Sequence, residues 1–177
     1  MNRFLLGFLM TLVCLSCSQE DRDTYRVMKA FVQSEIVLPS DLMKICEGKC
    51  EFNYLFDHSF FYVVYHGPEE CSQCEISHLY EMLPLFDLSA DYPKMEVVIV
   101  FSPSAEEMTS VVSSLVESRF EHPVFVDVTG VFQTMEIPQE RKYHHFLLND
   151  KNHPIIVGNV LASEKLMKML LNKISIY

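Results

Sequence analysis

The sequence predicts an α/β fold in which a central, mostly parallel sheet carries an antiparallel hairpin near its C-terminal end and is flanked by helices. Two apolar runs, at residues 60–65 and 95–101, are typical of strands buried on both faces. Each is followed by a segment with apolar residues at helical spacing. Strands that alternate with helices in this way favour a parallel sheet with right-handed crossover connections.

The remaining elements follow from shorter patterns. Pro84 is expected to kink or end the helix predicted over residues 74–88. A capping box at residues 104–107 predicts the start of a second helix that carries Val111, Leu115 and Val116, and Ser163 is expected to cap a last one. Further strands are predicted at residues 36–38, 124–128, 145–149 and 155–160, the last two forming a hairpin around a polar turn.

The N-terminus has the pattern of an export signal. Arg3 precedes an almost wholly apolar stretch over residues 4–15, which is shorter than the roughly 20 residues that a membrane span needs. Ser16-Cys17 and the polar residues after it resemble the lipobox of bacterial lipoproteins, which implies that Cys17 is acylated. An ordinary secretory signal is the alternative. We therefore divide the chain into a signal peptide (1–16), a tether with a short helix that covers part of the domain (17–35), and one folded domain (36–177).

The overall charge excludes some classes of partner. The chain has 14 Lys and Arg against 24 Asp and Glu, which gives a formal net charge of −10 at pH 7. A chain with this much negative charge has no electrostatic basis for binding nucleic acid or an anionic membrane surface. Any attachment to a membrane is therefore expected through a covalently bound lipid.

The motif Cys71-Ser72-Gln73-Cys74 is the main candidate for chemistry, because it stands between a predicted strand and a predicted helix. Two thiols three residues apart at a helix start can close a disulfide, and the free N–H groups of the helix favour a thiolate on Cys71. We expect Cys71 to attack and the more buried Cys74 to resolve the mixed disulfide. The carboxylates of Glu69 and Glu70 are expected to disfavour that thiolate. A static structural disulfide is the alternative.

Several parts together resemble the thioredoxin superfamily, and in particular bacterial thioredoxin-like lipoproteins. They are the strand before Cys71, the Cys71/Cys74 helix, the strand at 95–101, and the hairpin 146–159 with the helix after it. The resemblance covers residues 35–177 and implies a thioredoxin-like fold and a surface-anchored or periplasmic thiol–disulfide oxidoreductase. Its partners would be protein thiols and disulfides and an unidentified redox partner.

The same resemblance implies where substrate binds. In the family a cis-proline three residues before the hairpin phenylalanine faces the disulfide and binds substrate backbone. Counting back from Phe146 places Tyr143 there, beside His144, so both are predicted substrate-binding residues; Pro138 would serve only if the loop is shifted. Because that proline is credited with keeping metals off the dithiol, its absence leaves open a site in which His144 or His145 joins Cys71 and Cys74.

Other candidates have simpler interpretations. Cys46 and Cys50 flank a predicted loop and can form a local disulfide, bind metal or remain free; we predict the disulfide. His66 could sit near the dithiol and His78 follows Cys74 on the same helix face, although both are more typical of surface or packed histidines.

We therefore predict a lipid-anchored thiol–disulfide oxidoreductase that acts outside the cytoplasm and needs no cofactor or metal. A non-catalytic binding lipoprotein with a structural disulfide and a metal-binding protein of the same fold are the alternatives.

Overall fold

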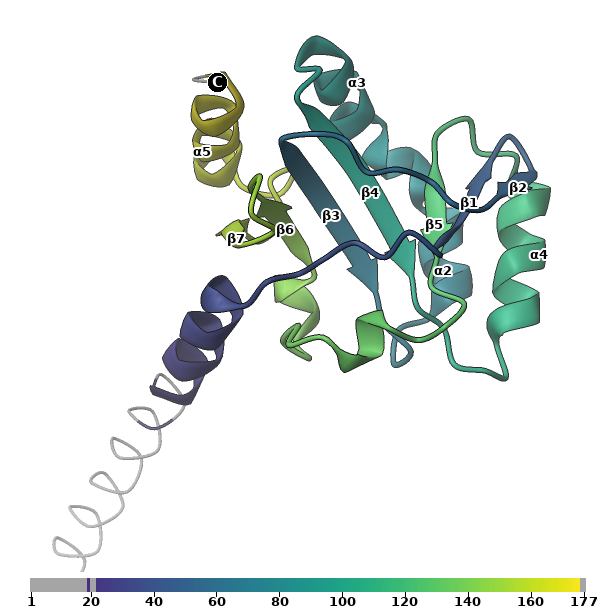
Figure 1. Cartoon of the computed structure of the whole chain (residues 1–177), viewed down its shortest axis with the longest axis horizontal. Coiled ribbons are helices and arrows are strands. Elements are labelled where there is room, and N and C mark those ends of the chain that lie inside the picture. The colour runs from purple at the N-terminus through teal and green to yellow at the C-terminus, as the bar shows by residue number, and fades with distance from the viewer. Residues whose placement is uncertain (1–18, 20–21, 176–177) are drawn as a thin grey trace, which may run out of the picture.

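A computed structural model describes residue 19 and residues 22–175. In this part of the chain the strands form one seven-stranded sheet in the order β2-β1-β5-β4-β3-β6-β7 (Figure 1). The central strands β3, β4 and β5 are parallel, and all other neighbours are antiparallel. The strands are β1 (Met43–Cys46), β2 (Lys49–Glu51), β3 (Phe60–His66), β4 (Met95–Phe101), β5 (Val124–Val126), β6 (His145–Leu148) and β7 (Pro154–Val157). The predicted mixed sheet with a late antiparallel hairpin is confirmed.

The helices connect the parallel strands and follow the hairpin. They are α2 (Ser72–Ser77), α3 (Leu83–Asp91), α4 (Met108–Ser118) and α5 (Glu164–Ser175), with short 3-10 helices η1 (Leu79–Met82), η2 (Phe132–Thr134) and η3 (Arg141–Tyr143). Residues 22–33 are also helical. None of the helices in the described ranges is long and apolar enough to cross a membrane. The predicted signal peptide and the predicted acylation site at Cys17 lie outside the described residues.

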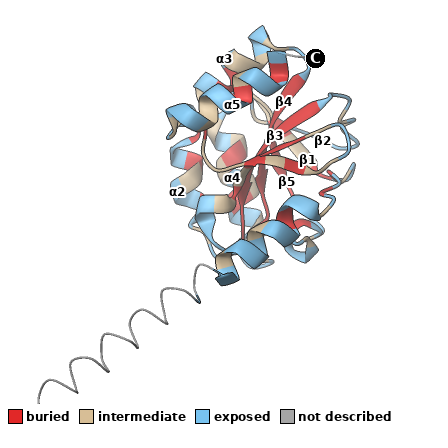
Figure 2. Ribbon diagram, turned by 90° about the vertical axis from the view of Figure 1, so that its left-hand side faces the viewer, coloured by how far each residue is buried: buried red, intermediate tan, exposed pale blue. Residues whose placement is uncertain are grey.

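Every residue of β3 and β4 is buried, so these two strands separate two hydrophobic cores (Figure 2). Successive side chains of a strand point to opposite faces. On one face, Tyr62 and Ile99 pack with apolar residues of α2, α3, α4 and α5. The other face, with Val63 and Val100, is covered mainly by the chain around residues 31–42, 54–56 and 132–137. Helices α2–α5 therefore gather on one face, and the end of the helix at residues 22–33 together with irregular segments covers the other.

Several predicted elements differ from the structure. Residues 36–38 form no strand; Ile36 and Leu38 are buried while Val37 is exposed, so their alternation reflects packing on the face of the sheet. The predicted helix at 74–88 is divided into α2, η1 and α3, with Pro84 in the first turn of α3, where a missing N–H is tolerated. Helix α4 begins only at Met108, because residues 105–107 form a turn after Ser104.

The predicted loop between Cys46 and Cys50 is part of a β-hairpin. Glu47 and Gly48 have φ values of 51° and 75°, as the two-residue turn of a hairpin requires. In its register Cys46 faces Lys49, and Cys50 faces Ile45. The two cysteines therefore point to opposite sides of the hairpin and are free thiols, so the predicted second disulfide is wrong for this structure.

Candidate functional site

The dithiol motif lies at the carboxyl end of β3. The chain leaves β3 at His66 and turns, with Glu70 N–H donating to Gly67 O at 3.1 Å. Cys71 then caps α2, and its Sγ accepts a hydrogen bond from Cys74 N–H at 3.3 Å. Cys71 and Cys74 form a disulfide with Cα atoms 5.3 Å apart. Both are exposed, so the expectation of a buried Cys74 is wrong; α2 runs across the surface at this point.

Behind the disulfide lies a cluster of charged side chains centred on Glu70. The Glu70 side chain is only 9% exposed. One carboxylate oxygen contacts His66 Nδ1 at 3.3 Å, and the other accepts a hydrogen bond from His144 Nδ1. Arg141 Nε lies 3.5 Å from the same carboxylate. Burial by itself raises the pKa of Glu70, but the hydrogen bonds from His144 and His66 outweigh it and lower the pKa to about 2. Glu70 is therefore an ionised and compensated carboxylate.

The His144 ring is held between two oxygen atoms. Its Nε2 lies 2.9 Å from Pro138 O, and its Nδ1 faces the Glu70 carboxylate. The positive guanidinium of Arg141 lies beside the same carboxylate. The negative charge that was expected to disfavour a Cys71 thiolate therefore comes less from Glu70 than from the carboxylate of Glu69, which is exposed.

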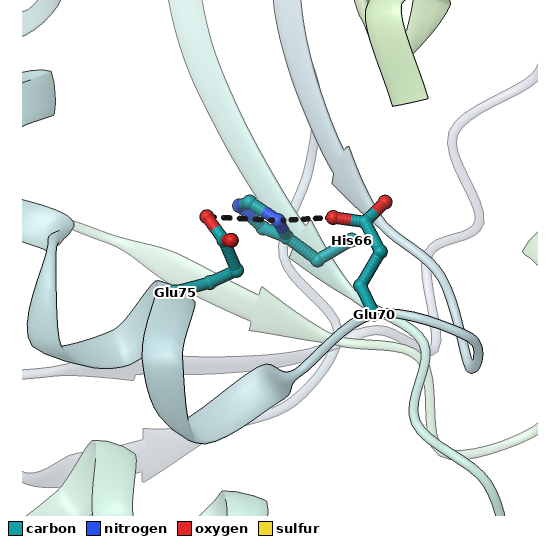
Figure 3. Close-up of side chains that lie close together, drawn as sticks. All are labelled: His66, Glu70 and Glu75. Atoms are coloured by element: carbon teal, nitrogen blue, oxygen red, sulfur yellow. Dashed lines mark hydrogen bonds and ion pairs between the residues drawn. The ribbon is translucent and has the colours of Figure 1, made fainter. Parts of the chain in front are cut away.

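A second carboxylate faces the same histidine. The His66 ring lies between Glu70 and Glu75, with Nδ1 3.8 Å from Glu75 Oε2 (Figure 3). One ligand atom from each of these three residues lies within 4.8 Å of the others, which is a spacing that a metal ion could use. Arg141, however, forms ion pairs with both Glu70 and Glu75.

The histidines of the predicted metal set point in different directions. His144 contacts the Tyr65 ring on one side of the sheet, and His145 contacts the Tyr62 ring on the other. Burial, and then the charge of His66, lower the pKa of His145 to about 4. The structure thus separates the two histidines, as strand alternation predicts. His78 lies on the surface and contacts Glu81 at 2.7 Å.

An open groove of about 920 Å³ lies beside Cys71. The buried carboxylate of Asp127 positions one wall, because it accepts hydrogen bonds from Ser102 Oγ and from Phe132 N–H, both at 2.8 Å. Among the described residues that line the groove are Phe132, Met135, Ile137, Pro138, Arg141 and His144. A second hollow beside Cys74 is lined by residues that include His66, Glu75 and His145.

Of the two predicted substrate-binding residues, only His144 lines this groove. Tyr143 belongs to η3, where Lys142 Nζ lies 4.7 Å from the centre of its ring. Pro138 takes the place beside the groove instead, and no peptide bond within the described residues is cis. Counting back from Phe146 missed it because the turn of η3 separates Pro138 from β6.

Arg141 and Glu75 belong to the site although the sequence did not predict them, and Glu70 is not the uncompensated charge that its sequence neighbours suggested. Arg141 is 66 positions from Glu75, and His144 is 74 positions from Glu70. No spacing pattern in the sequence brings such residues together, so only the fold reveals the cluster.

The fold and the site together define the class of protein. Strands β4, β3, β6 and β7 lie side by side in that order, α2 starts with a disulfide directly after β3, and α5 follows the hairpin. This is the thioredoxin-like fold, as the sequence predicted.

No family model matches the chain, and no curated protein does either. Among solved structures, the chain is similar to an uncharacterized thioredoxin-like protein from Porphyromonas gingivalis, with 13% identity, a TM-score of 0.48, and coverage of 78% of this chain and 89% of the other. A thioredoxin-like protein from Bacteroides caccae has 10% identity and a TM-score of 0.46. The alignment covers 85% of this chain but only 55% of the Bacteroides caccae chain. A domain of a possible thiol-disulfide isomerase from Cytophaga hutchinsonii has 12% identity, a TM-score of 0.42, and coverage of 80% and 99%.

Proposed function

We propose that this protein is a lipid-anchored thiol–disulfide oxidoreductase that acts outside the cytoplasm. The observation that supports it best is the exposed Cys71–Cys74 disulfide at the start of α2, beside a groove lined by apolar residues and by charged residues of both signs. Support for export and anchoring comes from the sequence alone, in the apolar stretch that ends in Ser16-Cys17.

The reaction is a pair of exchanges. A substrate thiolate attacks Cys71 Sγ and breaks the bond to Cys74, which leaves as a thiolate and takes a proton from solvent. A second substrate thiolate then attacks the substrate sulfur of the mixed disulfide, and the Cys71 thiolate leaves. The substrate loses two electrons and two protons and becomes a disulfide, while Cys71 and Cys74 become thiols. The reverse sequence reduces a substrate disulfide, and a redox partner restores the starting form.

The reduction potential of the Cys71–Cys74 couple tests this proposal. Equilibration with glutathione or dithiothreitol buffers, read out by thiol alkylation and mass, gives the potential. An exchange catalyst is expected between about −270 and −120 mV, whereas a value below about −300 mV indicates a structural disulfide and the non-catalytic alternative. A Cys46→Ser, Cys50→Ser double variant provides the control, because it removes the two free thiols and leaves the couple intact.

A metal-binding role is the second candidate, favoured by the approach of His66, Glu70 and Glu75. It predicts near-stoichiometric zinc in the purified protein, lost in His66→Ala. It also predicts tighter zinc binding in Arg141→Gln, because the guanidinium competes for both carboxylates. Zinc-free protein whose disulfide is reversibly reduced supports the exchange function instead.

A further inference from the structure

Strand β2 leaves one edge of the sheet open. It is the last strand of the sheet in the described part of the chain, next to β1 (Figure 1), and all three of its residues are exposed. Antiparallel neighbours alternate between hydrogen-bonded and non-hydrogen-bonded pairs, and the two-residue turn makes Cys46 and Lys49 a hydrogen-bonded pair. The backbone N–H and C=O of Cys50 therefore point away from β1, toward the open edge. Such an edge is a template for another strand.

The charges on the side chains of β2 are complementary between two copies of the strand. Antiparallel pairing of two copies about Cys50 places Lys49 of each copy opposite Glu51 of the other. Opposite charges across an antiparallel pair stabilise it, and here a two-fold axis supplies two such pairs. Phe52, which follows β2 directly, is 55% exposed and adds apolar surface at this edge. Leu55, 79% exposed, adds apolar surface beside it.

In this pairing the two-fold axis passes between the two Cys50 residues, each of which carries a free thiol. Cys50 is exposed and unpaired in this structure. Directly opposed residues in a hydrogen-bonded antiparallel pair have Cα atoms about 5.5 Å apart. That separation lies within the range of about 4.4–6.8 Å found for disulfides. Cys46, on the other side of the hairpin, is only partly exposed and its Sγ contacts Glu121 O at 3.2 Å, so it does not reach the axis.

We propose that two copies of this chain pair through β2 and are joined by a disulfide between their Cys50 residues under oxidising conditions. A three-residue strand buries far less than the roughly 1,000 Å² of a stable interface, so the covalent bond holds the dimer. Two Cys50 thiols lose two protons and two electrons, and a disulfide oxidant such as glutathione disulfide takes them up and becomes two thiols. Cys50 lines neither the groove beside Cys71 nor the hollow beside Cys74, and the dimer does not depend on the exchange function.

The test uses full-length protein in detergent, reduced and then incubated with glutathione disulfide. Dimer formation is followed over time on non-reducing gels, and the linked peptides are identified by mass spectrometry. Wild type and Cys46→Ser are expected to form a Cys50–Cys50 dimer at equal rates, and Cys50→Ser is expected to remain monomeric. A dimer that persists in Cys50→Ser, or a wild type that stays monomeric, overturns the proposal.

A charge reversal separates specific pairing from random collision of exposed thiols. Lys49→Glu places like charges across both symmetric pairs and is expected to slow dimer formation by about three- to tenfold. Lys151→Glu changes the net charge equally, at an exposed position in the β6–β7 turn, and is expected to form dimer at the wild-type rate. Far-UV circular dichroism confirms that both variants are folded. Equal rates in Lys49→Glu and Lys151→Glu show collision without strand pairing and overturn the proposed interface.

Discussion

Replacing Glu70 with Gln removes the one charge on which His66, Arg141 and His144 converge, and leaves the size of the side chain almost unchanged. The pKa of Glu70 is lowered from 4.5 to about 2. At about 1.4 kcal/mol for each pKa unit, this difference corresponds to about 3 kcal/mol of folding stability at neutral pH. Glu70→Gln is therefore expected to lower the free energy of unfolding by about 3 kcal/mol at pH 7.

The pH dependence gives a second and more specific readout. A carboxyl group whose pKa is lower in the folded state stabilises the fold above its unfolded pKa, and this contribution is lost as the pH falls through the folded pKa. The stability difference between wild type and Glu70→Gln should thus be full near pH 6–7, begin to shrink below about pH 4.5, and approach zero near pH 2.

Urea unfolding at several pH values, followed by far-UV circular dichroism because the chain has no tryptophan, measures this difference. Glu69→Gln is the matched control: Glu69 is the adjacent, exposed carboxylate, and its replacement should change stability by less than about 0.5 kcal/mol. If Glu70→Gln loses less than about 1 kcal/mol at pH 7, or if its effect does not change with pH, the compensated cluster does not exist as described.

Three further predictions concern the disulfide, the anchor and the hairpin. Cys74→Ser should trap mixed disulfides with substrate, visible on non-reducing gels, whereas Cys71→Ser should not, because Cys71 Sγ is the attacking atom; equal trapping by both would contradict these roles. Cys17→Ala should move the protein from the membrane to the soluble fraction or leave it unprocessed, and unchanged, detergent-dependent membrane association would exclude this anchor. Gly158→Ala should lower the free energy of unfolding in urea by about 1–3 kcal/mol, because φ is +122° and the new Cβ would lie 2.9 Å from Leu166 Cδ1; a neutral result would mean that the hairpin end adapts freely.

The sequence predicted the centre of the fold better than its edges. Strands β3 and β4 are continuous apolar runs because helices and irregular segments bury both faces, so their positions were predicted almost to the residue. Strand β2 has three exposed residues and no apolar alternation, so only the turn residues Glu47 and Gly48 could have indicated the hairpin. Segment 36–38 shows the opposite problem, because a strand-like alternation arises from packing against the face of the sheet.

The sequence likewise predicted one part of the candidate site and not the other. Cys71 and Cys74 are recognisable because their chemistry depends on local spacing, and the structure pairs them. The electrostatic surroundings of Cys71 depend on Arg141 and His144, which reach Glu70 only because β6 pairs with β3. Among its neighbours in sequence Glu70 has no compensating cation, whereas in the fold Arg141 and His144 contact its carboxylate.

The irregular cover of the second core has a consequence for where the chain can be cut. Phe31 packs edge-on against Phe146 with ring centres 5.2 Å apart, and Phe31, Ile36 and Leu42 are each only 1% exposed. Burial of such a side chain contributes about 1.5–3 kcal/mol, so these three together approach the whole stability of a typical domain, about 5–15 kcal/mol. A protease that cleaves between residues 36 and 42 would detach Phe31 and Ile36 from the rest of the core, and the released fragment would lose the roughly 3–6 kcal/mol that their burial contributes. In the proposed lipid-anchored protein, cleavage in this segment would therefore destabilise the domain as well as free it, whereas cleavage before residue 31 would leave this core intact.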